Sequence, residues 1–407
     1  MLRRLIFFLG LLVFSLATAA LVLFGAFLAW RIPREKAEAR VFQAEVRLDD
    51  GPHVTWLPDN RVRVSEIRFE RTRDEFQVLD RVLSCAEAQV AAASIDPNAR
   101  FDCVPKPASV CSVALAPLVA AVSDVHGHYR HLATLLRQAG VVDQRLDWAF
   151  GAGHLVVNGD VLDKGPEVTR CLWLIKKLEQ QAGEAGGQLH FLLGNHDHLA
   201  LTGRSRINDQ KYIKLADATG IAYASLFSPA TELGRWIRRH GVAVRVNDSL
   251  FVHGGISPAL LDAGATLDEL NGIARSNLSE EGVRSWSSQE RLISSLIWGQ
   301  EGLVWYRGYF DRSFPLGFWR TFRGDLRENQ AAEAAISRVC SQYGCRRIVV
   351  GHTDGREIRS LFGGRLVAIS QRLGMFDVLD DGARGEVLLI DGRALTRVTI
   401  TGQRLPL

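Results

Sequence analysis

The first half of the chain alternates short apolar runs with helical stretches, and this alternation constrains the fold more than any other feature. Residues 118–122, 155–157 and 189–193 are apolar runs of strand length. The segments 131–139 and 167–181 between them have a helical pattern. Strands that alternate with helices indicate an α/β layered fold with parallel pairing. We therefore predict an α/β domain with helices outside its sheets.

Further strands are predicted on both sides of this region. Residues 242–246, 250–252 and 348–350 are apolar runs, and 387–400 reads as a hairpin turning at Asp391-Gly392. Residues 46–69 read as two strands that are interrupted at 49–52 and at 58–60. At 407 residues with 47% hydrophobic content, the chain is long enough for one large core or two modest ones.

Residues 5–30 carry no charge, and a helix of this length crosses a hydrocarbon core of about 30 Å. A cleaved signal peptide is the alternative, because Ala17-Thr18-Ala19 offers a cleavage pattern, but the apolar run continues beyond it. We expect a transmembrane anchor at 1–30, a juxtamembrane spacer at 31–45 and one catalytic domain at 46–407. Lys and Arg flank both ends of the run, so they do not decide its orientation.

Charge and cysteine content narrow the class of protein. The formal net charge is +4 and dispersed, which argues against a nucleic-acid partner. No pair of the six cysteines forms a CxxC motif, which argues against a structural zinc site. The neighbouring pairs Cys103/Cys111 and Cys340/Cys345 permit disulfides, and buried free thiols are the alternative. We expect a single-pass protein of the inner or cell membrane with its catalytic domain outside the cytoplasm.

Each apolar strand is followed by residue types that bind metals. The segments that follow the strands are Asp124-Val125-His126-Gly127, Asn158-Gly159-Asp160, Gly194-Asn195-His196-Asp197, His253-Gly254-Gly255 and Gly351-His352-Thr353. Ligands in open α/β sheets gather outside the carboxyl ends of strands, so we expect these segments to converge. Carboxylates, imidazoles and an Asn carbonyl together suit two divalent metal ions such as Mn, Fe or Zn. The glycines let the backbone turn sharply beside each ligand.

In this order, the runs SDVHG, GDVLDKG, GNHD, HGG and GHT resemble the calcineurin-like metallophosphoesterases. Within them the chain is most similar to the phosphoprotein-phosphatase type and its bacterial, Shewanella-like branch. The early DGPHV segment and the WYRG segment at 305–308 support that branch. The resemblance implies a two-sheet sandwich flanked by helices.

By that resemblance, the ligands of the first metal are Asp124, His126 and the bridging Asp160, and those of the second are Asp160, Asn195, His253 and His352. A hydroxide shared by both metals would attack the phosphate. His196 resembles the general acid that protonates the leaving oxygen, and Asp163 would orient it. Arg307 is our candidate for a bidentate phosphate clamp, with a surface arginine as the alternative.

Two positions depart from the family pattern. Lys164 stands where the family usually has Arg, so it would bind substrate as a point charge rather than as a fork. Asp197 stands where Glu is common, so any hydrogen bond it makes to a neighbouring loop would need rearrangement. The segment 204–239 carries an excess of positive residues and is expected to form one wall of the substrate groove. A solvated helical surface explains that excess equally well.

The expected activity is hydrolysis of phosphate monoesters, on a phosphoprotein at Ser/Thr or Tyr. A diadenosine polyphosphate or a small phosphorylated metabolite would use the same metals. A nuclease or phosphodiesterase would act on bis-esters instead. The alternative from another class is an inactive, membrane-tethered binding protein, but every expected ligand and acid position is filled.

Overall fold

The chain is described from a computed structural model, which places residues 48–103, 111–205, 209–278, 286–311, 326–371 and 385–407. The expected anchor at 5–30 and the spacer at 31–45 lie outside these residues. Among the helices that are described, none is both long and apolar enough to cross a membrane.

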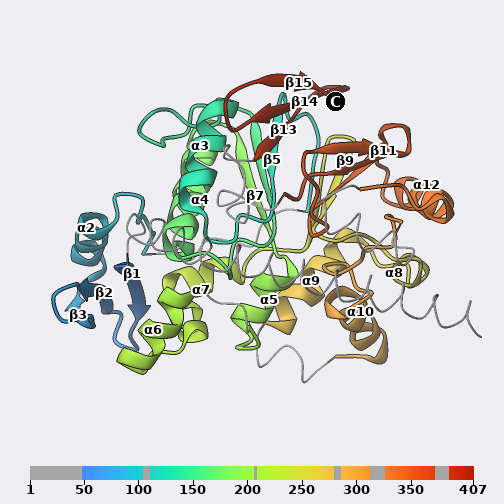
Figure 1. The fold of residues 1–407 in the computed structure, drawn as a ribbon. Helices are drawn as coiled ribbons and strands as arrows, with labels where there is room; N and C mark the ends of the chain where they lie inside the picture. The colour runs from blue at the N-terminus through green and yellow to red at the C-terminus, as the bar shows by residue number, and fades with distance from the viewer. Residues whose placement is uncertain (1–47, 104–110, 206–208, 279–285, 312–325, 372–384) are drawn as a thin grey trace, which may run out of the picture. The chain divides into compact units, whose positions relative to one another are not determined.

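Within the described residues the strands form three sheets (Figure 1). The first has the order β15-β14-β13-β5-β6-β7 and the second the order β11-β12-β10-β9-β8-β4. The first sheet consists of β5 (Val119–Val122), β6 (His154–Asn158), β7 (Gln188–Leu192), β13 (Glu386–Asp391), β14 (Ala394–Thr399) and β15 (Arg404–Pro406). The second consists of β4 (Ser112–Val113), β8 (Ala243–Val246), β9 (Ser249–Val252), β10 (Arg347–Val350), β11 (Arg359–Leu361) and β12 (Leu366–Ala368).

The strand pairing confirms the α/β prediction. Strands β5, β6 and β7 pair in parallel, as do β9, β10 and β12. Strands β13 and β14 form the predicted hairpin, with Asp391 opposite Ala394 across the turn. Parallel pairing places the carboxyl ends of neighbouring strands at the same edge, and this arrangement positions the site.

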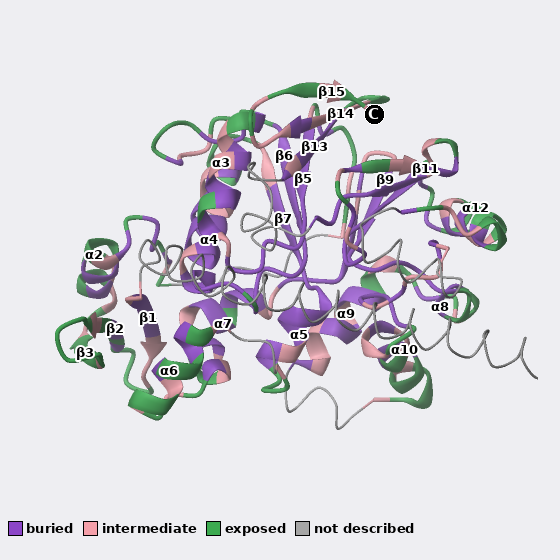
Figure 2. Cartoon of the chain, in the orientation of Figure 1, coloured by how far each residue is buried: buried purple, intermediate pink, exposed green. Residues whose placement is uncertain are grey.

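The two large sheets face each other across an apolar layer. Along β5, Val119 and Ala121 belong to the cluster between the sheets, whereas Ala120 and Val122 belong to the cluster on the opposite, helix-covered face. This alternation follows from the two-residue period of a strand. Because both faces of the central strands β5, β6, β9 and β10 are covered, these strands are buried throughout (Figure 2) and appear in the sequence as largely apolar runs.

Helices cover the outer faces of the sheets. Helix α3 packs on β13 and β14, and α4 packs on β7 (Figure 1). The described helices are α2 (Cys85–Ile95), α3 (Tyr129–Ala139), α4 (Val168–Glu184), α5 (Asn195–Leu201), α6 (Gln210–Thr219), α7 (Glu232–Ile237), α8 (Pro258–Asp262), α9 (Leu267–Asn277), α10 (Ser288–Trp298) and α12 (Glu333–Gln342), with 3-10 turns at Tyr223–Phe227, Gln330–Ala332 and Phe362–Gly364. Helices α2, α9 and α10 begin with capping boxes.

A third sheet, β1 (Asp50–Trp56), β2 (Val62–Glu70) and β3 (Glu75–Leu83), was only partly predicted. Residues 49–52 do not interrupt a strand, because β1 begins at Asp50 and continues through Gly51-Pro52. The proline is tolerated because β1 is an edge strand and its register shifts between Asp50 and His53. Strand β3 is largely exposed, and its five apolar residues do not alternate strictly, so the sequence did not indicate it.

The cysteine pairing differs from the sequence expectation. Cys103 is bonded to Cys85 at the start of α2, so the Cys103–Cys111 pairing is wrong. Cys111, Cys171, Cys340 and Cys345 are free thiols. The disulfide closes an 18-residue segment that contains α2, and proximity in the sequence did not indicate it.

Candidate active site

The predicted ligand residues lie in the loops that directly follow five buried strands. Asp124 follows β5, Asp160 follows β6 and Asn195 begins α5 after β7. From the second sheet, His253 follows β9 and His352 follows β10. All these side chains are buried. The carboxyl ends of strands from both large sheets thus bring them together, as the sequence predicted.

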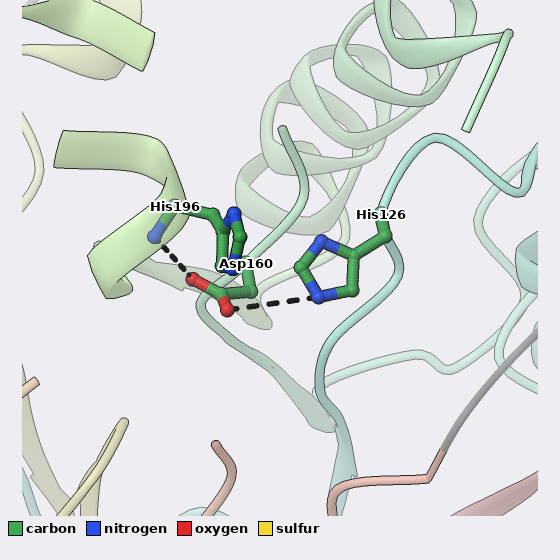
Figure 3. A group of neighbouring side chains, drawn as sticks. All are labelled: His126, Asp160 and His196. Carbon is green, nitrogen blue, oxygen red and sulfur yellow. Dashed lines mark hydrogen bonds and ion pairs between the residues drawn. The ribbon is translucent and has the colours of Figure 1, made fainter. Parts of the chain in front are cut away.

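The carboxylate of Asp160 lies at the centre of this group. Its Oδ2 atom is 3.2 Å from His253 Nε2 and 3.6 Å from His126 Nε2. Its Oδ1 atom accepts a hydrogen bond of 2.8 Å from the backbone N–H of His196. Figure 3 shows His126, from the loop after β5, and His196, from the start of α5, on either side of this carboxylate. Asp160 therefore has the position expected of a bridging ligand.

Two groups of donor atoms share Asp160. Within each group, Asp160-His126-His196 and Asp160-His253-His352, the donor atoms lie within 4.8 Å of one another. Asn195 joins the second group, with its Oδ1 atom 3.1 Å from His253 Nε2. Asp124 lies at the margin of the second group, where its Oδ2 atom accepts hydrogen bonds from Ser123 Oγ at 2.6 Å and the backbone N–H of His352 at 3.1 Å.

Burial sets the protonation of the cluster. It lowers the pKa of His126 and of His352 well below the usual range, and nearby positive charges add to the effect. Burial also acts to raise the pKa of Asp160, but the charge and hydrogen bond of His253 outweigh it and hold that pKa well below the ordinary value. For His253, by contrast, burial acts to lower the pKa, but the charge and hydrogen bond of Asp160 outweigh it and raise that pKa to about 9. Because a metal ion binds neutral imidazole, it would displace that proton from His253.

The donor set fits divalent cations. The Nδ1 atoms of His126 and His253 lie 3.0 and 2.8 Å from the backbone carbonyl oxygens of Leu162 and Asn158. Donation to those carbonyls directs both Nε2 atoms at the cluster, where a metal ion would take the place of the Lys164 ammonium beside His126 and of the proton on His253. The Nε2 atom of His352 is buried and has no hydrogen-bond partner among the described residues. A cation would satisfy all three nitrogen atoms.

The backbone of the site is held in an uncommon conformation. Asp124, His126, Asp160 and His352 have φ angles of 54°, 46°, 56° and 61°, in the left-handed region that side chains other than glycine rarely adopt. Glycines permit the close approach of neighbouring loops, as the sequence suggested. A Cβ atom on Gly194 would lie 2.2 Å from Asp160 Oδ1. Such strain is characteristic of functional sites.

His196 and Asp163 form the predicted pair. His196 Nδ1 lies 2.9 Å from Asp163 Oδ2, and both side chains are buried. The His196 ring meets that of His126 edge-on at a centroid distance of 4.9 Å. Because Nδ1 is engaged by the carboxylate, Nε2 is the nitrogen that remains for a substrate.

The two predicted substrate-binding cations both reach the ligand cluster. Lys164 Nζ lies 2.6 Å from His126 Nε2. Arg307 Nη2 donates to the carbonyl oxygen of His352 at 3.4 Å. Trp305, two residues before Arg307, packs edge-on against the His352 ring. Both cations thus lie beside predicted metal ligands, with Arg307 half-buried and Lys164 exposed at the rim of the cluster.

Asp197 connects the loops that carry the ligands. Its Oδ1 atom accepts from the backbone N–H groups of Val161 and Leu162 at 3.0 Å, and its Oδ2 atom from those of Asp160 and Gly194 at 2.8 Å. Burial raises the pKa of Asp197 to about 6, although the backbone donors act in the opposite direction. The shorter side chain therefore fits these four donors directly.

Sequence reasoning missed other residues around the site. Lys211, counted among the positive residues of a groove wall, is instead buried, with Nζ 2.8 Å from Asp50 Oδ1 and 3.0 Å from the carbonyl oxygen of Pro166. Tyr223 and Ser205 both contact Asp163. Their partners are far away in the sequence, so no local pattern indicated these contacts.

Comparisons with known proteins agree with this geometry. Residues 117–355 match the family described as Calcineurin-like phosphoesterase (Metallophos). An uncharacterized protein of Schizosaccharomyces pombe is 28% identical over 270 residues, which are 63% of this chain and 73% of that protein. Shewanella-like protein phosphatase 1 of Plasmodium berghei is 24% identical over 239 residues, or 58% of this chain and 60% of that protein. The match thus spans less than two thirds of the Plasmodium protein.

A solved structure extends the similarity to most of the chain. The crystal structure of a cold-active protein-tyrosine phosphatase of a psychrophilic Shewanella species superimposes with a TM-score of 0.72 at 28% identity. The superposition covers 88% of this chain and 99% of that chain.

Proposed function

The chain belongs to the calcineurin-like phosphoesterase family, and from this premise we propose that it is a phosphoprotein phosphatase that works with two divalent metal ions. The observation that carries the proposal is the cluster around Asp160, in which two groups of metal-binding side chains share one carboxylate beside the His196–Asp163 pair. The names of the Plasmodium and Shewanella proteins support a protein substrate.

Two metal ions would be held around the shared Asp160, and His196, a member of the first group of donor atoms, is assigned to the acid instead because Asp163 engages its Nδ1. The first ion would be held by Asp124, His126 and Asp160, and the second by Asp160, Asn195, His253 and His352. When bound, the two cations would lower the pKa of a water molecule towards neutrality and offset the negative charge of the phosphoryl group. Manganese, iron and zinc all suit these ligands.

The chain's own contribution to bond cleavage is a proton held on His196. Asp163 accepts the hydrogen bond from Nδ1, which fixes the orientation of the ring and stabilises its protonated form. The proton on Nε2 is then available to the leaving oxygen of the ester. General acid catalysis of this kind contributes about 100- to 10,000-fold to a rate.

Arg307 and Lys164 would orient the phosphate. Both cationic groups lie at the ligand cluster, next to His352 and His126 respectively. A guanidinium can bind two phosphate oxygens at once, whereas the ammonium of Lys164 acts as a single point charge. We therefore assign the orienting role to Arg307 and a neutralising role to Lys164.

The test is release of inorganic phosphate from a phosphotyrosine peptide by the full chain, with EDTA, then with added Mn²⁺, and beside a His196→Asn variant. We expect activity that requires metal and that falls about 100-fold or more in the variant. A folded, metal-loaded chain that releases no phosphate from phosphotyrosine, phosphoserine or p-nitrophenyl phosphate would favour the inactive binding protein. Activity only on diadenosine tetraphosphate or on a bis-ester would show that the substrate is not a phosphoprotein.

We also propose that residues 5–30 anchor the chain in the membrane, with the catalytic domain outside the cytoplasm. The Cys85–Cys103 disulfide supports this location, because disulfides persist in oxidising compartments. Protease added to intact spheroplasts should then digest the catalytic domain. Digestion only after the membrane is permeabilised would place the domain in the cytoplasm.

A further inference from the structure

Ser205 contacts the acid pair from the far end of α5. Its Oγ atom donates a hydrogen bond of 2.7 Å to Asp163 Oδ2. The same oxygen lies 2.9 Å from His196 Nδ1. His196 stands at the beginning of α5 and Ser205 lies just beyond its end. The two ends of the segment 196–205 therefore both contact the same oxygen atom, Oδ2 of Asp163.

The backbone after α5 gives Ser205 a defined position. The helix ends at Leu201 with Thr202 as its C-cap, after which Gly203 N–H donates to the carbonyl oxygen of Ala200 at 3.2 Å and Arg204 N–H donates to that of Leu199 at 2.8 Å. These bonds turn the chain back towards the β6 loop that carries Asp163. The contact from Ser205 is therefore anchored to the same helix that presents His196.

Asp163 has little else to fix the rotation of its carboxyl group. Its backbone N–H donates to Tyr223 Oη at 3.0 Å, which holds the main chain but not the side chain. Its Oδ1 atom is buried and has no hydrogen-bond partner among the described residues. The terminal side-chain torsion angle of an aspartate (χ2) has a broad distribution, so the carboxyl group is not fixed by its own rotamer preference. A second donor on Oδ2 therefore decides which oxygen faces the imidazole.

We propose that Ser205 is a positioning residue for the general acid, fixing the Asp163 carboxylate so that His196 is held ready to protonate the leaving oxygen. This inference rests on the proposed role of His196. The contact by which Ser205 would act is its hydrogen bond to Asp163. It acts by restricting Asp163, so its loss would matter most where the leaving group needs a proton.

The test compares two substrates that differ in their need for an acid. Phenyl phosphate releases a phenol of pKa about 10, which requires protonation, whereas 2,4-dinitrophenyl phosphate releases a much weaker base that leaves unaided. With the Mn²⁺-loaded full chain, we expect Ser205→Ala to lower kcat on phenyl phosphate roughly tenfold, with KM little changed. On 2,4-dinitrophenyl phosphate the loss should stay below about twofold.

Matched variants separate positioning from folding. Ser205→Thr keeps the hydroxyl and should restore most of the kcat on phenyl phosphate. Ser205→Cys, with a weak donor of similar size, should resemble Ser205→Ala and replaces it if that variant does not fold. Thr202→Val is the control from the same turn, because Thr202 Oγ1 donates to the carbonyl oxygen of His198 and not to Asp163. It should show no dependence on the leaving group.

The outcomes separate this inference from the proposed function. Equal losses on both substrates, or no loss on either, in Ser205→Ala would overturn the positioning role. His196→Asn serves as the reference, since it should lose far more activity on phenyl phosphate than on the dinitrophenyl ester. If His196→Asn shows no such difference, the general-acid assignment itself fails. If His196→Asn shows this difference between the two substrates and the Ser205 variants do not, His196 remains the general acid and Ser205 does not position it.

Discussion

Asp160 places one carboxylate between two groups of ligand side chains, so its charge should matter more than its shape. Asp160→Asn is nearly isosteric but removes the negative charge that both groups share. We expect kcat/KM to fall by at least about 100-fold, with weaker metal binding. Turnover across a Mn²⁺ titration, together with metal content measured after gel filtration, tests this. Full activity in the variant would contradict the bridging assignment.

Asp197 fits four backbone donors that come from two loops. Asp197→Asn turns an N–H₂ group towards two of those donors, and Asp197→Glu adds a methylene at a fully buried position. Unsatisfied buried donors cost about 1–3 kcal/mol each, so we expect Asp197→Asn to lower the free energy of unfolding by about 2–4 kcal/mol. Urea unfolding in EDTA measures this. An unchanged midpoint of urea unfolding would show that the four hydrogen bonds accepted by Asp197 do not stabilise the fold.

The convergence of the candidate ligand residues could be predicted because each stands directly after an apolar strand. Asp124 and His352 are examples: the strand places them and the residue type gives the chemistry. Ser205 could not be predicted, because its partner Asp163 lies 42 positions away and a serine in a loop carries no signal. The pairing of Cys85 with Cys103 was missed for a similar reason, since it depends on how α2 folds back.

At the scale of elements, β1 is tied to the catalytic loop through one buried ion pair. Lys211 in α6 binds Asp50 in β1 and the carbonyl oxygen of Pro166, which directly follows the β6 loop. Thr169 in α4 donates to Asp50 Oδ2 at 2.9 Å. Burial acts to raise the pKa of Asp50, but Lys211 and His53 outweigh it and hold that pKa below the usual range. The pair thus joins three elements.

Lys211→Met should therefore be costly, since it leaves the Asp50 carboxylate buried without its cation. Breaking a buried pair from one side costs about 3–5 kcal/mol, and we expect this loss in the free energy of unfolding at pH 7. The double variant Asp50→Asn/Lys211→Met should recover part of it. Urea unfolding of both variants checks the prediction. Equal stability of Lys211→Met and the wild type would show that the pair does not stabilise the fold.

Strands and helices could be predicted where their burial produces a regular pattern of apolar residues in the sequence. Strand β6 is covered on both faces and appears as an apolar run, and Asp391-Gly392 marks the β13–β14 turn. Strand β3 is exposed along most of its length although five of its nine residues are apolar, so its burial could not be read from its composition. Its place beside β2 is decided by pairing with another strand, which a local pattern does not contain.

At the scale of the whole catalytic unit, the ligands come from both large sheets. His126 and Asp160 belong to loops of the first sheet, and His253 and His352 to loops of the second. Metal ions held by both sets would stabilise the packing of one sheet on the other. At free Mn²⁺ of about 100 times the dissociation constant, we expect a gain of about 2.7 kcal/mol per site. Thermal unfolding with Mn²⁺ and with EDTA measures it, and Asp160→Asn should show a smaller difference.

Buried histidines that lie away from the ligands should contribute to the pH dependence of stability, opposed between pH 6 and 4 by Asp197, whose pKa is raised to about 6. Burial lowers the pKa of His190 in β7 to about 3 and that of His240 to about 4. Both therefore stay neutral in the folded chain below pH 6.5, where the unfolded chain binds a proton at each. Above about pH 6.5 both histidines are neutral in the folded and the unfolded chain and do not lower the free energy of unfolding. As the pH falls from 6.5 towards 4, only the unfolded chain takes up these protons, so the free energy of unfolding decreases.

His190→Gln tests this window, because glutamine has no charge to gain. Each such histidine should make the free energy of unfolding fall by up to about 1.4 kcal/mol per pH unit between pH 6 and 4. We expect the variant, measured by urea unfolding at several pH values, to show a slope smaller by about this amount. EDTA in every sample removes the separate effect of protons on metal binding. The carboxylate of Asp50, whose pKa is depressed, contributes its own acid sensitivity only below about pH 4, where its unfolded form takes up a proton. Equal slopes in variant and wild type would mean that His190 is protonated in the folded chain as readily as in the unfolded one.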